Sequence, residues 1–329
     1  MNPQKKFQEH KIKYSLSLLW GELKEFVKKD FNFWAYAYTF VFIVIILVVN
    51  FKFGFYAKVI RPTYYSGNSM WVFVVFYSAV YFAAAIPNLL IRQEYALLKN
   101  PKFYIKSLFF IVLYSFCVGY FSYRNWQIPS FSATENAFVN RLISNVKSIV
   151  FITLPLLVLK IFYDKKIDGL YGLSKNSKHI KVYALALAVM MPFVIAASFS
   201  ADFQSAYPQF QAWNYEGVFH LPTWLYTSFF ELAYLGDFIN TELFFRGAMV
   251  IGMSAILGKR AVLPMVAFYV SIHFGKPLGE AISSMFGGYI LGILAYQTRH
   301  IWGGVFAHIG IAFTMEIMGL LQYYFLSKI

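Results

Sequence analysis

Cysteine and charge are both scarce in this sequence. Cys117 is the single cysteine among 329 residues, which excludes an internal disulfide and any metal site built from several cysteines. Only 13% of the residues are Asp, Glu, Lys or Arg, whereas 59% are hydrophobic. A soluble domain typically has about 25% charged residues. The composition therefore excludes an ordinary soluble protein and predicts a polytopic membrane protein.

Signatures of nucleotide and zinc binding are also missing. The segment 168–173 has two glycines but lacks the Gly-Lys-Ser/Thr ending of a phosphate-binding loop, so we interpret it as a cytoplasmic turn. No His-Glu-x-x-His sequence is present to hold zinc. The net charge of +14 does not indicate nucleic acid as a partner, because the lysines lie between apolar runs.

Long apolar runs dominate the sequence instead. A helix crosses the roughly 30 Å of bilayer hydrocarbon with about 20 residues. Runs of this kind begin near Phe33, Met70, Phe103, Val146, Val182, Thr223, Ala261, Leu278 and Ile301. They predict an all-α, polytopic bundle of transmembrane helices with about eight or nine spans, and the lipid bilayer is the first expected partner.

Lysine and arginine are distributed unevenly over the connections between these runs. The connection 165–181 is rich in lysine, whereas the connection 201–222 contains neither lysine nor arginine. Basic residues favour the cytoplasmic side, so the two connections should face opposite compartments, with the N-terminus in the cytoplasm. We expect a multi-pass protein of a bacterial plasma membrane.

Three regions follow from this pattern. Residues 1–30 form a basic, amphipathic cytoplasmic tail, residues 31–221 a transmembrane scaffold with few ionisable groups, and residues 222–326 the region that carries the chemistry. The apolar stretch from Thr223 to Gly258 is roughly 54 Å long as one straight helix, which exceeds the bilayer. We predict a break at Gly236-Asp237, with Asp237 as the N-cap of a second helix.

The ionisable residues within apolar runs of this last region include Glu242, Arg246, His273 and His308. Charge at membrane depth is a functional-site hypothesis by default. Glu242 and Arg246 are four residues apart, a spacing that favours an ion pair on one helix, and that pair could serve only to neutralise two buried charges. A histidine alone could be a hydrogen-bonded packing element. Their concentration in one region predicts a shared polar site.

The same residues resemble three motifs of the CPBP family, intramembrane proteases that include the type II prenyl-protein (CAAX) proteases and bacteriocin-immunity relatives. The family pattern is Glu-Glu-x-x-x-Arg, Phe-x-x-x-His and His-x-x-x-Asn. The corresponding segments are Thr241-Glu242-Leu243-Phe244-Phe245-Arg246, Tyr269-Val270-Ser271-Ile272-His273 and His308-Ile309-Gly310-Ile311-Ala312. The resemblance covers roughly residues 222–325 and rests on the order and spacing of the motifs together.

The resemblance implies a mechanism in which the first glutamate and the histidine of the second motif activate water, while the third motif stabilises the oxyanion. Thr241 occupies the position of the first glutamate and Ala312 that of the asparagine. Threonine alone is a poor general base, and alanine donates no side-chain hydrogen bond. Glu242, His273 and His308 are the candidate catalytic residues, and the supporting candidates are Arg246, Thr241, Tyr269, Ala312 and Asp237.

Two carboxylates could replace the missing chemistry. Asp237 precedes Thr241 by four residues and Glu316 follows Ala312 by four, so each would lie one helical turn from the altered position. Our hypothesis is that one of them supplies the lost function. The alternatives are an N-cap role for Asp237 and a buried or snorkelling carboxylate for Glu316.

Three functions remain open from the sequence. The first is an intramembrane endopeptidase that hydrolyses a membrane-embedded or lipidated peptide. The second is a catalytically silent relative that binds a peptide or lipid as an immunity factor or scaffold. A transporter ranks last, because the two halves of the chain show no matched pair of broken segments. No cofactor is certain, and two histidines fall short of the three protein ligands usual for catalytic zinc.

Overall fold

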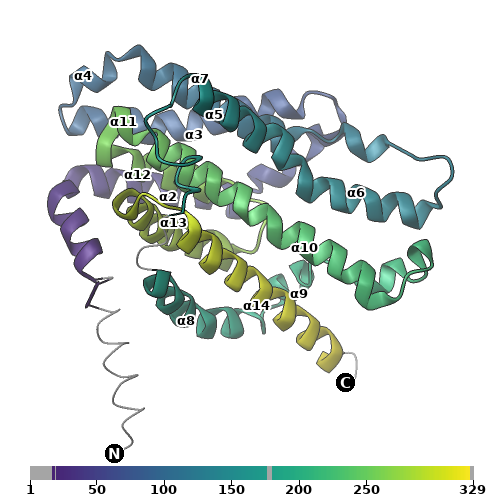
Figure 1. Ribbon diagram of the computed structural model, residues 1–329. Helices are drawn as coiled ribbons and strands as arrows, with labels where there is room; N and C mark the ends of the chain where they lie inside the picture. Colours follow the sequence, from purple (N-terminus) through teal and green to yellow (C-terminus); the bar gives the residue numbers. More distant parts are fainter. Residues whose placement is uncertain (1–16, 19, 176–179, 327–329) are drawn as a thin grey trace, which may run out of the picture.

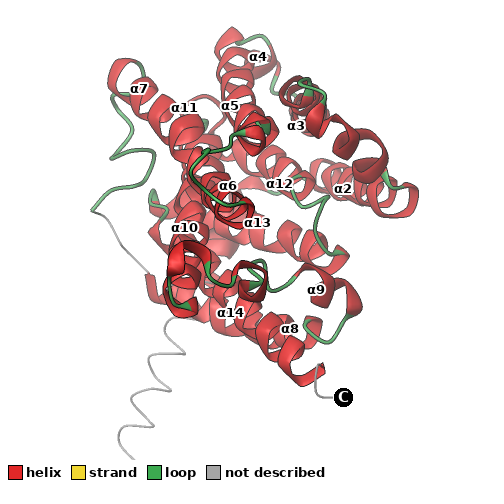
Figure 2. Ribbon diagram, turned by 90° about the vertical axis from the view of Figure 1, so that its right-hand side faces the viewer, coloured by secondary structure: helices red, strands yellow, loops and turns green. Residues whose placement is uncertain are grey.

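The computed structural model describes residues 17, 18, 20–175 and 180–326. Within these ranges the chain is helical, and the only β-type pairing is an isolated bridge between Leu170 and Leu173. Figures 1 and 2 show the helices packed as a bundle, with α10 between a group that includes α5 and α6 and a group that includes α8 and α14. The predicted all-α bundle is confirmed.

The helices fall into two groups along the chain. The N-terminal group is α2 (Phe33–Phe53), α3 (Ser69–Ile91), α4 (Tyr95–Leu98), α5 (Pro101–Gly119), α6 (Ala133–Ser148) and α7 (Leu154–Phe162), with a π-helical segment, η4 (Ile149–Thr153), joining the last two. The C-terminal group is α8 (Ile180–Ala197), α9 (Ala201–Ala206), α10 (Thr223–Glu242), η7 (Leu243–Gly252, π-helical), α11 (Ser254–Leu257), α12 (Val262–Ser271), α13 (Leu278–Thr298) and α14 (Trp302–Leu326).

Seven segments among the described residues are long and apolar enough to cross a membrane. One of them, Thr223–Ser271, has 49 residues, roughly twice the number that a single span needs. The backbone leaves helical geometry inside it at Gly258, where φ is 55° and ψ is −135°. Counted as two crossings, this segment raises the total to eight. The apolar stretch Tyr183–Ala197 is shorter, and it accounts for the ninth run in the sequence.

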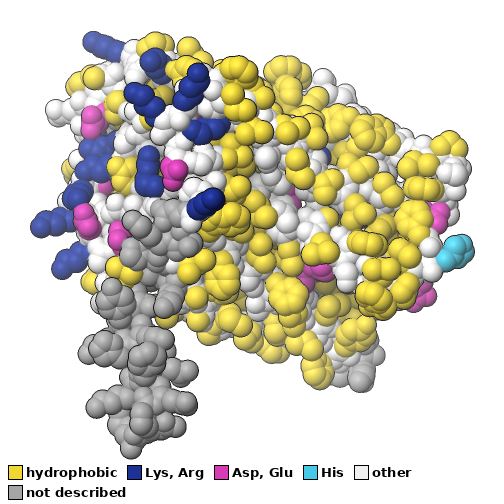
Figure 3. Space-filling model, in the orientation of Figure 1, with side chains coloured by type: hydrophobic (Ala, Val, Ile, Leu, Met, Phe, Trp, Pro, Cys, Tyr) yellow, Lys and Arg dark blue, Asp and Glu magenta, His cyan; other side chains and the backbone are white. Residues whose placement is uncertain are grey.

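Basic side chains gather at one end of the bundle. In Figure 3 the lysines and arginines cluster at the end where Figure 1 places α4 and α11, while apolar side chains cover most of the visible remainder. This separation is the pattern on which the predicted topology rests, because Lys and Arg favour the cytoplasmic side. The cytoplasmic location of the N-terminus and the bacterial membrane stay predictions.

Part of the N-terminal tail forms the expected amphipathic helix. Residues 20–30 are helical, with Phe26 and Asp30 buried and several lysines exposed. Asp30 accepts hydrogen bonds from Arg92 at 3.2 Å and from Arg260 at 2.6 Å. The tail is thereby attached to α3 and to the turn before α12. Residues 1–16 of the predicted tail lie outside the described residues.

The predicted break at Gly236-Asp237 is wrong. Helix α10 continues through both residues to Glu242, and Asp237 accepts a hydrogen bond from the Ser148 hydroxyl of α6 instead of capping a helix. A glycine costs a helix interior only about 1 kcal/mol, which packing of α10 against α6 and α14 can offset. The change of geometry comes later, where the α-helix gives way to η7.

The core lies around η7 and α12. Every residue of these two elements is buried, and they pack against α3, α5 and α13. Phe244, Phe245 and Phe268 contact one another and the ring of Tyr114. Helices α3 and α5 therefore pack against the short α12 and the π-helical segment and support them.

Candidate active site

Glu242 and Arg246 form a fully buried ion pair where α10 becomes η7. Arg246 Nη1 lies 2.9 Å from Glu242 Oε1, and the two side chains are 1% and 0% exposed. The four-residue spacing brings the groups onto one side of the helix, as predicted. Burial of either charge alone would be costly, so each residue stabilises its partner.

His308 of α14 joins this pair. Its Nδ1 lies 3.0 Å from the same oxygen, Glu242 Oε1. Its ring packs against Phe238, one turn before Glu242, at 4.3 Å between centroids and tilted by 39°. Because a carboxylate can only accept, the hydrogen atom belongs on Nδ1 of His308. The other ring nitrogen, Nε2, is left as an acceptor.

Gly304 makes room for this contact on α14. A Cβ atom at this position would overlap Oε2 of Glu242, so any larger residue would push the carboxylate away from His308. Glu242 Oε2 and the Nε and Nη2 atoms of Arg246 are buried and have no hydrogen-bond partner within the described residues. The cluster therefore retains hydrogen-bond donors and an acceptor that no described protein group satisfies.

Tyr269 of α12 lies at the centre of the site. The guanidinium of Arg246 is 4.2 Å from the centre of its ring. The rings of His273 and His308 lie at centroid distances of 4.8 Å and 6.4 Å from it, both edge-on. The missing side chain of Gly288 in α13 lets Tyr269 pack closely there. The first position of the second motif therefore separates and orients the two histidines.

His273 lies in the connection after α12, outside the candidate spans. Its Nδ1 is 2.8 Å from the Tyr269 carbonyl oxygen, which can only accept a hydrogen bond, so Nδ1 carries the hydrogen atom. Burial lowers the pKa of His273 to about 4, and the ring is neutral at pH 7. Across the described residues, no carboxylate forms an ion pair with His273.

The structure does not place Thr241 and Asp237 with the histidines. Both line a second cavity, between α5, α6 and α10, with a volume of about 240 Å³. The geometric part of the prediction is correct, since Asp237 and Thr241 share one face of α10. The lining of this cavity contains neither His273 nor His308, and Thr241 and Glu242 have different surroundings because successive helical residues point about 100° apart.

Ala312 and Glu316 of α14 are both buried. The two carboxylate oxygens of Glu316 each lie 2.9 Å from the backbone nitrogen of Gln209. This carboxylate therefore anchors the segment before α10. The alternative of a buried structural carboxylate fits this geometry better than replacement of lost chemistry.

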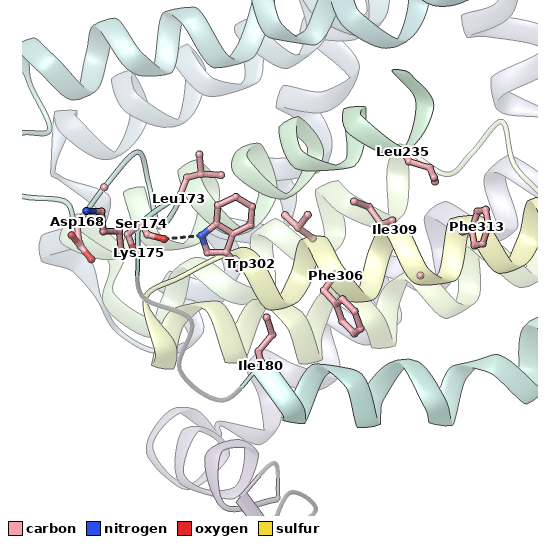
Figure 4. A pocket seen from close by; sticks show the side chains of 13 residues that line it. Asp168, Leu173, Ser174, Lys175, Ile180, Leu235, Trp302, Phe306, Ile309 and Phe313 are labelled. Atoms are coloured by element: carbon pink, nitrogen blue, oxygen red, sulfur yellow. Dashed lines mark hydrogen bonds between the residues drawn. The ribbon is translucent and has the colours of Figure 1, made fainter. Parts of the chain in front are cut away.

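A large apolar groove runs along α14 beside the site (Figure 4). Its volume is about 1380 Å³, and its lining includes Trp302, Phe306, Ile309 and Phe313 of α14 and Leu235 of α10. Asp168, Ser174 and Lys175 lie at one end, where Trp302 donates a 2.7 Å hydrogen bond to the Ser174 carbonyl. Ile309 is next to His308 in sequence, so the groove and the polar site share one helix.

Sequence reasoning missed two features that support the site. Phe238 packs against His308, and Gly304 makes room for Glu242. The signal for Gly304 that the sequence offered was the pair Gly303-Gly304.

The segment 168–173 is more than a turn, because Tyr171 is fully buried and packs against Gly247 and Gly252 of η7. Its hydroxyl donates to Asp164, which also pairs with Lys106 at 2.6 Å.

The donor set does not fit a catalytic metal. In the described part of the chain, no group of three or more His, Cys, Asp or Glu side chains is placed to hold a metal ion. Glu242 Oε1 is already shared by Arg246 and His308, and His273 directs Nδ1 to a backbone carbonyl. The side chains of Glu242 and the two histidines are therefore not placed to bind a catalytic metal.

Taken together, the helical bundle and its cluster of an acid, an arginine and two histidines define a multi-pass membrane protein with a polar site inside the bundle. Residues 218–314 match the family of type II CAAX prenyl endopeptidases described as Rce1-like. This stretch contains the three segments that correspond to the motifs, with their altered positions, and the match confirms the resemblance to the CPBP family. No curated protein and no solved structure matches the chain.

Proposed function

We propose that the protein is an intramembrane endopeptidase in which Glu242 acts through His308. The observation that carries the proposal is the position of Glu242 Oε1, 2.9 Å from Arg246 and 3.0 Å from His308. A carboxylate that holds Nδ1–H of a histidine fixes the tautomer and leaves Nε2 to accept a proton. His308 then serves as the general base for water.

His273 has a complementary position. Its Nδ1 is directed to the Tyr269 carbonyl, so Nε2 faces other partners, and the neutral ring can bind water or the substrate carbonyl. Tyr269 lies between the two imidazoles and under Arg246. The roles are an oriented base at His308, a positioning carboxylate at Glu242, and a second polar group at His273 for water or the peptide.

The substrate class follows from the surroundings. The groove on α14 is lined mainly by apolar side chains, and Val305 and Ile309 of its lining lie within one helical turn of His308 in the sequence. A hydrophobic segment or lipid chain in the groove would bring a covalently attached peptide bond to the polar site. We therefore assign a membrane-embedded or lipidated peptide as substrate.

The alternative is a catalytically silent protein that binds such a peptide or lipid. Two observations favour it: Ala312 offers no oxyanion donor, and Thr241 faces the second cavity rather than the histidines. Loss of one oxyanion donor costs about 10²- to 10³-fold in rate. A silent member would retain the groove and the ion pair but would not cleave peptides.

The test is peptide cleavage by the purified protein in lipid, with prenylated and plain transmembrane peptides as substrates. Cleavage should fall by about 10²-fold or more in His308→Ala and in His273→Ala. Asp237→Asn serves as the matched control and should cleave normally. Full activity in His308→Ala would contradict the proposed base.

Two further results would decide for the silent alternative. The parent would bind the peptides without cleaving them, and the combined Thr241→Glu and Ala312→Asn variant would gain cleavage.

If the parent cleaves but Asp237→Asn does not, the displaced carboxylate at Asp237 is the base and the role of Glu242 is structural.

A further inference from the structure

The second cavity is separate from the proposed hydrolytic site and has a different charge. It is formed by α5, α6 and α10 and by the segment that follows α5, and its volume is about 240 Å³. Lys147 and Arg124 contribute two positive charges to its lining, and Asp237 contributes one negative charge. From these residues the cavity has an excess of positive charge.

Neither cation forms a direct ion pair with a carboxylate of the described residues. The ion pairs found within the described residues include neither Lys147 nor Arg124. Lys147 Nζ donates to the Tyr120 carbonyl at 3.2 Å and lies 5.1 Å from the ring centre of Tyr123. Arg124 contacts the ring of Phe121 at 4.7 Å. These contacts position both cations, and the single carboxylate of the lining, Asp237, offsets only part of their charge.

The other polar side chains that line the cavity are compatible with a bound anion. The carboxylate of Asp237 accepts a hydrogen bond from the hydroxyl of Ser148. One of its oxygen atoms is therefore already bound by a residue of the cavity lining. Thr241 and Ser144 line the same cavity, and hydroxyl groups can donate to an oxyanion. Lys and Arg are the side chains that bind carboxylate and phosphate oxygens most strongly.

We infer that this cavity binds a small oxyanion, a phosphate or carboxylate group, held by Lys147 and Arg124. Its size supports this class of ligand, since a water molecule takes about 30 Å³ and the cavity therefore has room for one such group together with several waters. The group can be a free anion or the phosphate of a lipid headgroup. The inference does not depend on proteolysis, because no histidine lines the cavity.

The single cysteine of the chain reports on this site. Cys117 is a free cysteine that lines the cavity, and the sequence contains no other thiol. The experiment compares the rates at which an anionic and a cationic methanethiosulfonate modify the full-length protein in lipid nanodiscs. Each rate is divided by that for a free thiol, so that only the effect of the cavity remains.

The anionic reagent should be favoured by about tenfold or more, as expected where a cleft of one sign concentrates counterions. Lys147→Gln should remove most of this preference, and Thr241→Glu should reverse it by adding a carboxylate. Lys160→Gln is the matched control, because Lys160 also lies on the α6–α7 segment but not at the cavity. A parent protein without anion preference would overturn the inference.

Competition experiments distinguish a free anion from the phosphate of a lipid headgroup as the ligand. Inorganic phosphate should slow modification of Cys117 saturably in nanodiscs of uncharged glycolipid, whereas chloride at equal ionic strength should not. If protection instead appears only with phosphatidylglycerol in the nanodiscs, the headgroup is the ligand. Absence of protection in both arms contradicts the site.

A second measurement applies if Cys117 reacts with neither reagent. Phosphate should then raise the thermal unfolding temperature, relative to chloride, more in the parent than in Lys147→Gln, because phosphate also stabilises folded proteins in general. An equal rise in the two proteins would contradict the site. Equal unfolding temperatures of the parent in both salts would overturn the inference.

Discussion

Two faces of α10 show how differently adjacent residues of one helix can be used. On one face Glu242 is fully buried and shared by Arg246 and His308. On the other, Thr241 and Asp237 line a cavity whose cations form no direct ion pair within the described residues. Successive residues of a helix point about 100° apart, which separates these two faces. We call the face of Glu242 the closed face and the face of Thr241 and Asp237 the open face. Position in a motif therefore does not by itself place a side chain at the histidines.

The largest expected effect is on the closed face. Glu242→Ala leaves Arg246 as an unpaired buried charge, and we expect a loss of about 3–5 kcal/mol in unfolding free energy. Chemical denaturation in mild detergent measures this change. The double variant Glu242→Gln with Arg246→Met removes both charges and should recover much of the loss. A single variant as stable as the parent would contradict the buried pair.

The next effect concerns the close approach of α14 to α10. Gly304→Ala places a methyl group against Glu242 Oε2, and we expect a loss of about 1–3 kcal/mol together with reduced peptide cleavage. Gly287→Ala is the matched control, because a Cβ there meets nothing within 4 Å. Similar thermal unfolding and cleavage for the two variants would show that the contact is unimportant.

His273 predicts a dependence of stability on pH. Burial lowers its pKa to about 4 in the folded protein, below the usual value of about 6.5, so the unfolded chain binds more protons between these values. The stabilisation is fully present above pH 6.5 and is lost as the pH falls towards 4. His273→Asn should flatten unfolding profiles over this range, whereas His220→Asn, at an exposed site, should not.

The smallest effect belongs to the open face. Ser148→Ala removes the hydroxyl that donates to Asp237, which should cost about 0.5–1.5 kcal/mol and leave the rate of peptide cleavage unchanged. Parallel thermal unfolding and cleavage measurements test both parts. A strong loss of cleavage without a loss of stability would link the second cavity to the reaction and remove the distinction between the faces.

The sequence was informative where one physical rule dominates. Apolar runs of span length predicted the helical bundle, and the four-residue spacing predicted the pair of Glu242 and Arg246. The same reasoning failed at Gly236-Asp237, because contacts with α6 and α14 outweigh the low helix propensity of glycine. Such tertiary contacts have no local signal in one sequence.

The grouping of the candidate residues could be predicted from the sequence, whereas their arrangement could not, and their catalytic roles stay a prediction. The motifs identified Glu242, His273 and His308, yet the sharing of Glu242 Oε1 by Arg246 and His308 depends on the approach of α14 at Gly304. The second cavity was not predicted at all, because Lys147, Arg124 and Asp237 come from distant segments. The displaced carboxylates Asp237 and Glu316 were plausible by spacing, but their own hydrogen bonds direct them to Ser148 and Gln209.

One pair of variants tests the central claim most directly. Glu242→Gln and Asp237→Asn make the same carboxylate-to-amide change on α10, five residues apart, on its two different faces. Peptide cleavage in lipid, measured for both beside the parent, should be abolished in Glu242→Gln and retained in Asp237→Asn. The reverse result, or cleavage retained in Glu242→Gln, would contradict a mechanism in which Glu242 acts through His308.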